Sequence, residues 1–597
     1  MNTNGNQMKC RIWAFGAALA VQGLSLQAAI VNQTTGDGFG QSSFIDSARW
    51  SDLAAPSPGN DYVTAVLLRT PSAGGSYVFG GDSLTLDPGG TMLLKGPAGT
   101  LTFTDLILNG GSISNGDQSG YVLAGNIAVT ADSRFYSNDG NRTTTVLGPI
   151  SGSAQLEVGN GDTSGGGNTT TYIFAGDNSA FSGDFRLHNT SSSASYPSVT
   201  RFNNANASGT GSLLIDGPNI SIGNSSGGSI TLAGNNAQVW NNNFRFLGPD
   251  DLNLGTGAVS LGTATGSSRS VDVTNSGDTL TVGGVISNGT TANALVKRGA
   301  GSLVLNGNNT FTGGVTVQQG GILSIPTIAN TGVAQPLGQG TATVVLDGSG
   351  GTASVLQYTG GTASNNRNFA LAGTINAGGV FEVTSGAANL TLSGNITGAS
   401  AGFSKSGPGT LTLSGSGDWS GNTFVTAGTL HLNGGSINNT GNVDLSAGTT
   451  FRVNTSGQVR GDNINVADGS TLILEGGTLR TNTLNLNSTG IFDWGAGTIS
   501  MRQYNTGNAG SIDRTYVGGA VSGPSVFEGT IIDASGSLTS SAGSGVDLGQ
   551  LYINGGLRYD QLSVSGTLDL SAADDTLNLA FNPYLLRPNS PGSLIIE

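Results

Sequence analysis

The sequence predicts an all-β protein that winds as an elongated parallel β-solenoid, or β-helix, and three observations support this fold class. Segments of the chain repeat, runs of alternating apolar and polar residues recur about every 8 to 13 residues, and glycine accounts for 100 of 597 residues. Because side chains alternate across a strand, an apolar–polar–apolar triplet directs two side chains inward and one to solvent. Such repeats stack turn upon turn. A series of antiparallel β-sandwiches is the competing architecture.

The clearest repeat covers residues 297–313 and recurs at 405–421, with its glycines and its aromatic position in step. Reading upstream and downstream extends these units to about 280–325 and 390–432, and a weaker copy lies near 146–188. A repeat that keeps glycines and one aromatic residue specifies a backbone path and a buried face. With about 20 to 25 residues per turn, the mature chain would form roughly 25 turns in a rod on the order of 120 Å long.

Residues 1–28 have the pattern of a secretory signal peptide. Lys9 and Arg11 precede the apolar run Ile12–Val21, and a small residue ends the segment. This run of about ten residues is too short to span a bilayer, and no other stretch approaches the roughly 20 residues of a transmembrane helix. Cys10, the one cysteine, lies before the apolar run, so the mature chain is expected to lack disulfides and thiolate metal sites.

The mature chain divides into three β regions. Residues 29–141 are expected to form an N-terminal β region that caps the solenoid, with Trp50 and the segment 56–62 as part of the cap. A cap is needed because the end turn exposes apolar side chains and an unpaired strand edge. Residues 142–434 carry the repeats, and residues 435–597 continue the same triplets as further coils.

Charge excludes one class of partner. Only 10% of residues are charged, the net charge is -14, and the 22 lysines and arginines are scattered. Nucleic acid is therefore not an expected partner, because binding to phosphate needs concentrated positive charge. The acidity is compatible with a soluble exported protein.

The second copy of the repeat resembles a known family. It contains the pattern Lys405-x-Gly-x-Gly-Thr-Leu-Thr-Leu-x-Gly415, followed by Trp419-Ser-Gly421. This pattern is similar to the autotransporter-associated β-strand repeat of bacterial surface proteins. Residues 297–323 are a second match with one extra residue near Gly320-Gly321, and the stretch around Phe181 is a degenerate third.

The resemblance implies a right-handed parallel β-helix that is exported and lies at the cell surface, in association with the outer membrane or outside the cell. Its implied roles are adhesion and surface coating, and its implied partners are the secretion machinery and surface polysaccharide or other envelope components. The chain departs from a complete autotransporter because residues 435–597 show neither the strand pattern of a C-terminal translocator barrel nor a sorting tail. The expectation is a chain truncated at its C-terminus or an alternative export route.

A polysaccharide lyase or hydrolase on the same fold is the alternative function. Glycoside hydrolysis needs two carboxylates at matched separation, and the adjacent acidic pairs are Asp250-Asp251 and Asp574-Asp575. Neighbours on a strand point to opposite faces, so these pairs are predicted to mark turns. The two histidines, His188 and His431, are expected at outward strand positions without a nucleophile elbow.

Other candidate chemistry is weaker. The segment Gly159–Gly167 is superficially similar to a calcium loop but lacks a tandem nonapeptide and a closing glutamate. Four tryptophans are candidate platforms for sugar stacking: Trp50, Trp240, Trp419 and Trp494. Trp419, however, takes the position of Phe311 in the other copy, which predicts an aromatic stack within the coil. Lys297 and Lys405 are predicted to be corner residues of the repeat and not catalytic bases.

The sequence as a whole therefore predicts an exported surface or envelope protein, adhesin-like or structural, without catalytic, cofactor-binding or metal-binding residues. A periplasmic scaffold is a third hypothesis. Carboxylates that converge with arginine or lysine in one groove would favour the enzyme. A rod that presents ladders of serine, threonine and asparagine would favour the structural protein.

Overall fold

A computed structural model describes residues 28–502, with gaps at 117–119, 138–140, 162–168, 191–196, 264–267, 375–377, 455 and 487–489, and beyond them the backbone of eight short strands between 513 and 581. Side chains are described up to Asp493, except at 482, 483, 485 and 486. The predicted signal peptide, apart from its last residue, and the Asp574-Asp575 pair lie outside the described residues.

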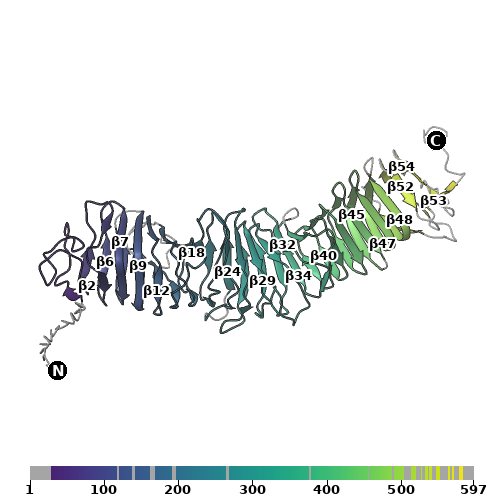
Figure 1. The fold of residues 1–597 in the computed structure, drawn as a ribbon. Helices are drawn as coiled ribbons and strands as arrows, with labels where there is room; N and C mark the ends of the chain where they lie inside the picture. The colour runs from purple at the N-terminus through teal and green to yellow at the C-terminus, as the bar shows by residue number, and fades with distance from the viewer. Residues whose placement is uncertain are drawn as a thin grey trace, which may run out of the picture.

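The described chain is an all-β parallel solenoid of about 17 turns, and it forms an elongated rod with the two termini at opposite ends (Figure 1). This confirms the predicted fold class. The competing sandwich series would need antiparallel partners, whereas the named strands of residues 28–502 pair with one another in parallel. No helix in the described residues is long and apolar enough to cross a membrane.

One face of the first half is a ten-stranded parallel sheet whose neighbouring strands belong to successive turns. Its strands are β3 (Leu67–Arg69), β6 (Thr91–Leu94), β8 (Ser112–Asn115), β10 (Ser133–Ser137), β13 (Leu156–Asn160), β15 (Phe185–Leu187), β17 (Leu213–Ile215), β20 (Gln238–Trp240), β23 (Val259–Ser260) and β26 (Ile286–Ser287).

The other faces are built by strands that pair from one turn to the next. In the first half these include β1 (Ala29–Asn32), β2 (Asn60–Thr64), β5 (Ser83–Leu86), β7 (Thr100–Asn109), β9 (Tyr121–Ala131), β14 (Thr170–Phe174), β16 (Ser198–Phe202), β18 (Ile220–Gly223), β21 (Phe244–Phe246) and β22 (Leu252–Asn253).

The first repeat lies near the middle of the rod, and the second lies further toward its C-terminal end (Figure 1). β24 (Ser268–Val273) precedes the first repeat, which occupies β25 (Thr279–Val282), β26, β27 (Ala294–Arg298), β28 (Ser302–Leu305), β29 (Val315–Gln318) and β30 (Ile322–Ile325), and β31 (Val344–Asp347) follows it. β35 (Gly379–Val383) precedes the second repeat, which occupies β36 (Asn389–Leu392), β37 (Ile396–Gly398), β38 (Phe403–Ser406), β39 (Thr410–Leu413), β40 (Ser416–Trp419), β41 (Thr423–Val425) and β42 (Thr429–Asn433). Further coils use β43 (Ser436–Asn439), β44 (Val443–Leu445), β45 (Thr450–Asn454), β46 (Gln458–Val466), β47 (Thr471–Leu486) and β48 (Ile491–Arg502).

The length of a turn varies while the pairing holds. Leu303 pairs with Leu323, 20 residues later, and Leu323 pairs with Leu356, 33 residues later. Most of the extra residues of the longer turn lie between β30 and β31, outside the strands, and the rest lie between β31 and Leu356. The uneven spacing of the repeats in the sequence therefore reflects excursions at corners and not breaks in the sheets.

The core consists of in-register columns of apolar side chains. Leu390, Leu411, Leu430, Phe451 and Leu472 pair in succession across five turns, and all are buried. Each is the first inward residue of a triplet, and the outward residue that follows it is polar in all of them except at Ile473, after Leu472. Burial of one such side chain contributes about 1.5 to 3 kcal/mol.

Aromatic residues form a second internal column in the same region. Phe381 lies 5.1 Å from Phe369 and 5.4 Å from Phe403, measured between ring centroids, and Phe403 stacks on Trp419 at 4.7 Å. Trp419 is fully buried. The prediction that the aromatic position of the repeat belongs to the interior is confirmed for this copy, and Phe311 is buried in the other.

At the N-terminal end, the segment between β1 and β2 packs on the first turns through two aromatic side chains. Phe44 contacts Phe79 and Phe103 edge-on at centroid distances of 5.4 and 5.7 Å, and Trp50 lies 4.8 Å from Tyr62. Both are buried. The segment thus places apolar side chains against the first coils, where the sequence predicts a cap.

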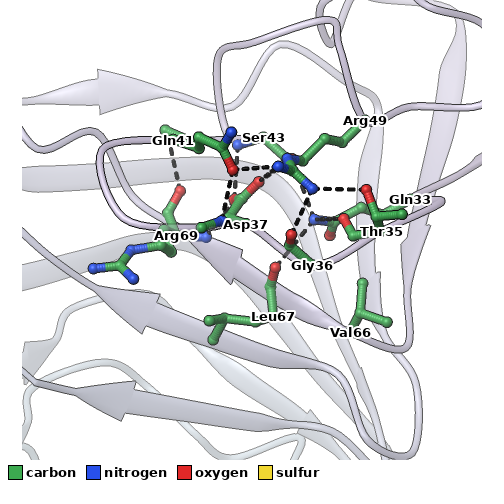
Figure 2. Close-up of polar contacts among 12 residues, drawn as sticks. Gln33, Thr35, Gly36, Asp37, Gln41, Ser43, Arg49, Val66, Leu67 and Arg69 are labelled. Carbon is green, nitrogen blue, oxygen red and sulfur yellow. Dashed lines mark hydrogen bonds and ion pairs between the residues drawn. The ribbon is translucent and has the colours of Figure 1, made fainter.

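A buried carboxylate organises this segment (Figure 2). One oxygen of Asp37 accepts hydrogen bonds from the backbone N–H of Ser43 and of Arg69, at 2.8 and 2.7 Å. The other accepts from the Ser43 hydroxyl at 2.6 Å and lies 3.6 Å from Nε of Arg49. Asp37 therefore ties the segment to the end of β3.

Candidate functional surfaces

Outward side chains on the ten-stranded sheet form a column of alternating charge. Arg134, Glu157 and Arg186 occupy the same register position on β10, β13 and β15, and Asp216 follows β17. Arg186 donates to Glu157 at 2.7 Å and to Asp216 at 2.5 Å, while Nε of Arg134 lies 4.0 Å from Glu157. These side chains are 19% to 38% exposed. Each ion pair therefore contributes at most about 1 kcal/mol.

Two further groups flank this column. Nδ1 of His188 lies 3.1 Å from the carbonyl oxygen of Asp216, and the guanidinium of Arg134 lies over the ring of Tyr136 at 4.2 Å. Two carboxylates, two arginines and a histidine thus meet on one face, a cluster that the sequence analysis missed. In the sequence, such a cluster is marked by residues of opposite charge at the outward positions of successive triplets. These residues can be matched to one another only when the register of the strands is known.

The chemistry of the charged column fits an ion-pair ladder better than an active site. A glycosidase acid must keep its proton, usually in apolar surroundings. Here both carboxylates accept hydrogen bonds from the guanidinium of Arg186, and both are partly exposed rather than enclosed by apolar side chains. The cluster lies across consecutive strands of one parallel sheet.

A shallow hollow lies on a different face, over the second repeat. Thr397, Asp418 and Asn438 occupy one register position on β37, β40 and β43. The amide of Asn438 donates to the carboxylate of Asp418 at 3.2 Å, and the Thr440 hydroxyl donates to the carbonyl oxygen of Ser420 at 3.1 Å. The lining contains short hydroxyl, amide and carboxylate groups on successive turns. Such a hollow presents hydrogen-bonding groups in a line but no nucleophile–base pair.

The acidic pair Asp250-Asp251 marks a turn, as predicted. Asp250 accepts from the backbone N–H of Gly227 at 2.7 Å, and Asp251 accepts from that of Thr279 at 2.8 Å. The two carboxylates thus bond to turns before and after their own. They do not converge on a common substrate position.

His431 lies at an outward position on β42, between Thr412 and Arg452 in the register. This is the outward strand position that the sequence predicts, and the side chain is half-buried there. Burial lowers its pKa below the ordinary value of 6.5, and the charge of Arg452 acts in the same direction. Nδ1 is 3.5 Å from the Thr412 hydroxyl, and Arg452 pairs with Glu475 at 2.6 Å. The neighbours do not form a Ser-His-Asp arrangement.

Three of the four candidate tryptophans are inaccessible to a sugar. Trp50, Trp240 and Trp419 are each at most 1% exposed, and each indole N–H is bonded within the protein. The side chain of Trp494 and most of the candidate calcium segment Gly159–Gly167 lie outside the described residues. Among the described side chains, no group of three or more His, Cys, Asp or Glu is placed to hold a metal ion.

The two repeat lysines are internal. Lys297 is 1% exposed and Lys405 is fully buried, and their ammonium groups reach the main-chain carbonyls of the corner that follows. Each lysine lies within a strand at an inward position, and only its side chain reaches the corner, so the prediction of corner residues is wrong. Neither lysine has access to a substrate. Their burial was not predicted, although each occupies an apolar position in its alternating run, two residues after Leu295 and Phe403.

Residues 295–325 and 403–432 match the family model of the passenger-associated transport repeat. These matches coincide with the two clear copies of the repeat. The chain is also 32% identical over 248 residues to the adhesin BmaC autotransporter of Brucella suis biovar 1, strain 1330. That match covers 40% of this chain and 6% of the relative, so the chain spans a small part of the protein it is similar to. No solved structure matches the chain.

Proposed function

We propose that this chain, an autotransporter-associated β-repeat protein, is exported to the bacterial cell surface and acts there as an adhesin-like passenger without catalytic activity. The observation that carries the proposal is the combination of the two transport repeats with an uninterrupted parallel solenoid. The similarity to an adhesin supports the same role. Export through the type V secretion system follows from membership among autotransporter passengers.

The outward faces support a binding role of a particular kind. Short polar side chains stand in register on successive turns, about 4.8 Å apart, and hydrogen-bond to one another. Asn438 donates to Asp418 at 3.2 Å, and Asn465 donates to Asp444 at 2.5 Å. Rows of fixed amide and hydroxyl groups suit a linear polar partner that lies along the rod. Surface polysaccharide and other envelope components are partners of this type.

The first test asks whether the protein is displayed and whether it adheres. Intact cells that carry the gene are treated with protease and antibody, and their attachment to host cells or to immobilised polysaccharide is compared with that of a deletion strain. We expect surface labelling and a loss of attachment in the deletion strain that the full-length gene restores. Protein confined to the periplasm, or unchanged attachment in the deletion strain, would contradict the proposal.

The second test locates the contact. Replacing Asp418 and Asn438 together by alanine removes the polar pair in the hollow, and replacing Asp105 and Asn126 removes a pair with the same hydrogen bond on turns near the N-terminus. We expect the first double variant to bind polysaccharide less tightly and the second to bind as the wild type does. Release of new reducing or unsaturated sugar ends by the wild type would instead support the enzyme.

A further inference from the structure

Lys297 and Lys405 stand in the middle of apolar core columns. Lys297 lies between Val271 and Val317 in the register, and Lys405 lies between Phe381 and Val425. Neither lysine has a carboxylate within ion-pair distance among the described residues. Burial of an unpaired ammonium is costly unless other groups replace its hydration. Main-chain carbonyl oxygens take that place here.

Lys405 has one acceptor for each of its protons. Its Nζ donates to the carbonyl oxygens of Ser406 and Gly407, both at 2.8 Å, and to that of Ala427 at 3.0 Å. The first two belong to its own corner, and Ala427 belongs to the next turn. An ammonium group has three N–H donors. This cage therefore fits the charged form and joins two turns.

Lys297 has only two such acceptors. Its Nζ donates to the carbonyl oxygens of Arg298 at 2.5 Å and Gly299 at 2.7 Å. The next turn carries the extra residue of the first repeat, and the backbone of Gly321 approaches so closely that a Cβ there would lie 2.8 Å from Nζ. A neutral amine has two N–H donors, so this cage provides an acceptor for each donor of the uncharged form.

We propose that the two repeat lysines are internal clamps in different charge states, Lys405 an ammonium that bridges two turns and Lys297 an amine that releases its proton as the first repeat folds. The one-residue difference between the repeats, near Gly320-Gly321, accounts for the change from three acceptors to two. The lysine of the first repeat then loses its proton when the repeat folds near neutral pH, whereas the lysine of the second repeat keeps its proton to a higher pH.

The charged groups near Lys297 and Lys405 are consistent with the proposed charge states of the two lysines. Asp272 on β24 acts on Lys297, and Glu382 on β35 acts on Lys405. Burial lowers the pKa of Lys297 from 10.5 to about 7 and that of Lys405 from 10.5 to about 8, and in each case the carboxylate opposes the shift. The three carbonyl oxygens around Lys405 also favour its charged form.

The assignment fixes the direction of a pH effect on stability. Between the folded pKa of Lys297, about 7, and its unfolded pKa of 10.5, the unfolded chain binds more protons than the folded one. The stability of the first repeat therefore rises with pH across this window, is complete above it, and is lost as the pH falls toward 7. Below the window this lysine contributes no further pH dependence.

The composition of the chain makes the direct test simple. Residues 29–597 contain three lysines, and each has a different successor: Lys95-Gly, Lys297-Arg and Lys405-Ser. Labelling with ¹³C-lysine and either ¹⁵N-arginine or ¹⁵N-serine therefore assigns the two buried lysines without mutation. Their Cε shifts in the full-length protein are then followed from about pH 6 to about pH 11.

We expect the Lys297 signal to titrate at lower pH than the Lys405 signal, with both midpoints below that of an ordinary lysine. Equal midpoints, or a lower midpoint for Lys405, would overturn the assignment. Lys297→Met and Lys405→Met add a second measurement, with Lys95→Met as control. Each variant should lose part of the rise in urea midpoint between neutral and alkaline pH, and the loss should be larger and begin at lower pH in the Lys297 variant than in the Lys405 variant. If neither variant folds, the titration of the wild type still decides the question.

Discussion

Single residues at the corners of the solenoid have the least freedom to change. Gly407 has a φ of +74°, and a Cβ on it would lie 2.4 Å from the carbonyl oxygen of Val383 on the preceding turn. Gly299 takes the same position in the first repeat, with a φ of +73° and the same close approach to Val273. The first glycine of the Lys-x-Gly pattern is therefore required twice, by its backbone conformation and by the space between turns.

Two glycine variants can separate the cost of the backbone conformation from the cost of the close approach between turns. Gly434 has a φ of +76°, but a Cβ on it would have no other atom within 4 Å. Gly434→Ala should cost only the conformational strain, about 1 to 2 kcal/mol. Gly407→Ala should cost clearly more, because the main chain of a neighbouring turn must move as well. Urea unfolding of the two variants measures the difference, and equal losses would show that close packing at Gly407 is unimportant.

His431 should make the stability of the protein depend on pH in mild acid. Because burial holds the pKa of His431 below 6.5, the unfolded chain binds a proton there before the folded chain does. Stability should therefore decrease as the pH falls through and below 6.5, and His431→Gln should reduce that decrease. Urea midpoints measured at about pH 7.5 and about pH 5.5 test this, with His188→Gln as the matched control. The same acid loss in both variants would contradict the role of His431.

At the scale of elements, the segment between β1 and β2 has the properties that the end of a solenoid needs. It buries Phe44 and Trp50 against the first coils and is fastened by the Asp37 carboxylate (Figure 2). We propose that it is the N-terminal cap. It covers apolar side chains that would otherwise face solvent at the first turn.

The cap should open when its carboxylate is removed. Asp37→Ala leaves two buried backbone N–H groups without their acceptor, which costs roughly 2 to 5 kcal/mol. Hydrogen exchange should then accelerate in residues 29–69 and remain unchanged in the second repeat. The exposed Asp46→Ala is the control and should leave exchange as it is in the wild type. Unchanged protection of residues 29–69 in Asp37→Ala would show that the carboxylate does not hold the segment.

The repeats show how far sequence reasoning reaches at this scale. The triplets around Leu411 and Leu430 predicted strands, their inward residues and the interior position of Trp419, because alternation and repeat spacing are local properties. The burial of Lys405 follows from the same alternation, but the usual cost of burying a charge argued against it. The column of Arg134, Glu157 and Arg186 could not be predicted, since turns of unequal length hide the register that aligns them.

Across the whole molecule, each turn contacts its neighbours along the rod (Figure 1). The stability of such a protein is approximately a sum of nearest-neighbour terms, so a local defect should stay local. Leu411→Ala removes a buried side chain from the column between Leu390 and Leu430 and should cost about 2 to 5 kcal/mol in that region. Hydrogen exchange should accelerate in the adjoining turns only. Uniform acceleration from end to end would indicate that the rod unfolds as a single unit.

The long excursion between β30 and β31 has a practical consequence. It contains 18 residues, against 9 in the corresponding stretch between β28 and β29, and yet Leu323 and Leu356 remain paired. Val333, within this excursion, is 52% exposed. The protein therefore already contains a tolerated insertion point, and a foreign peptide placed there would be carried outward on a rigid frame.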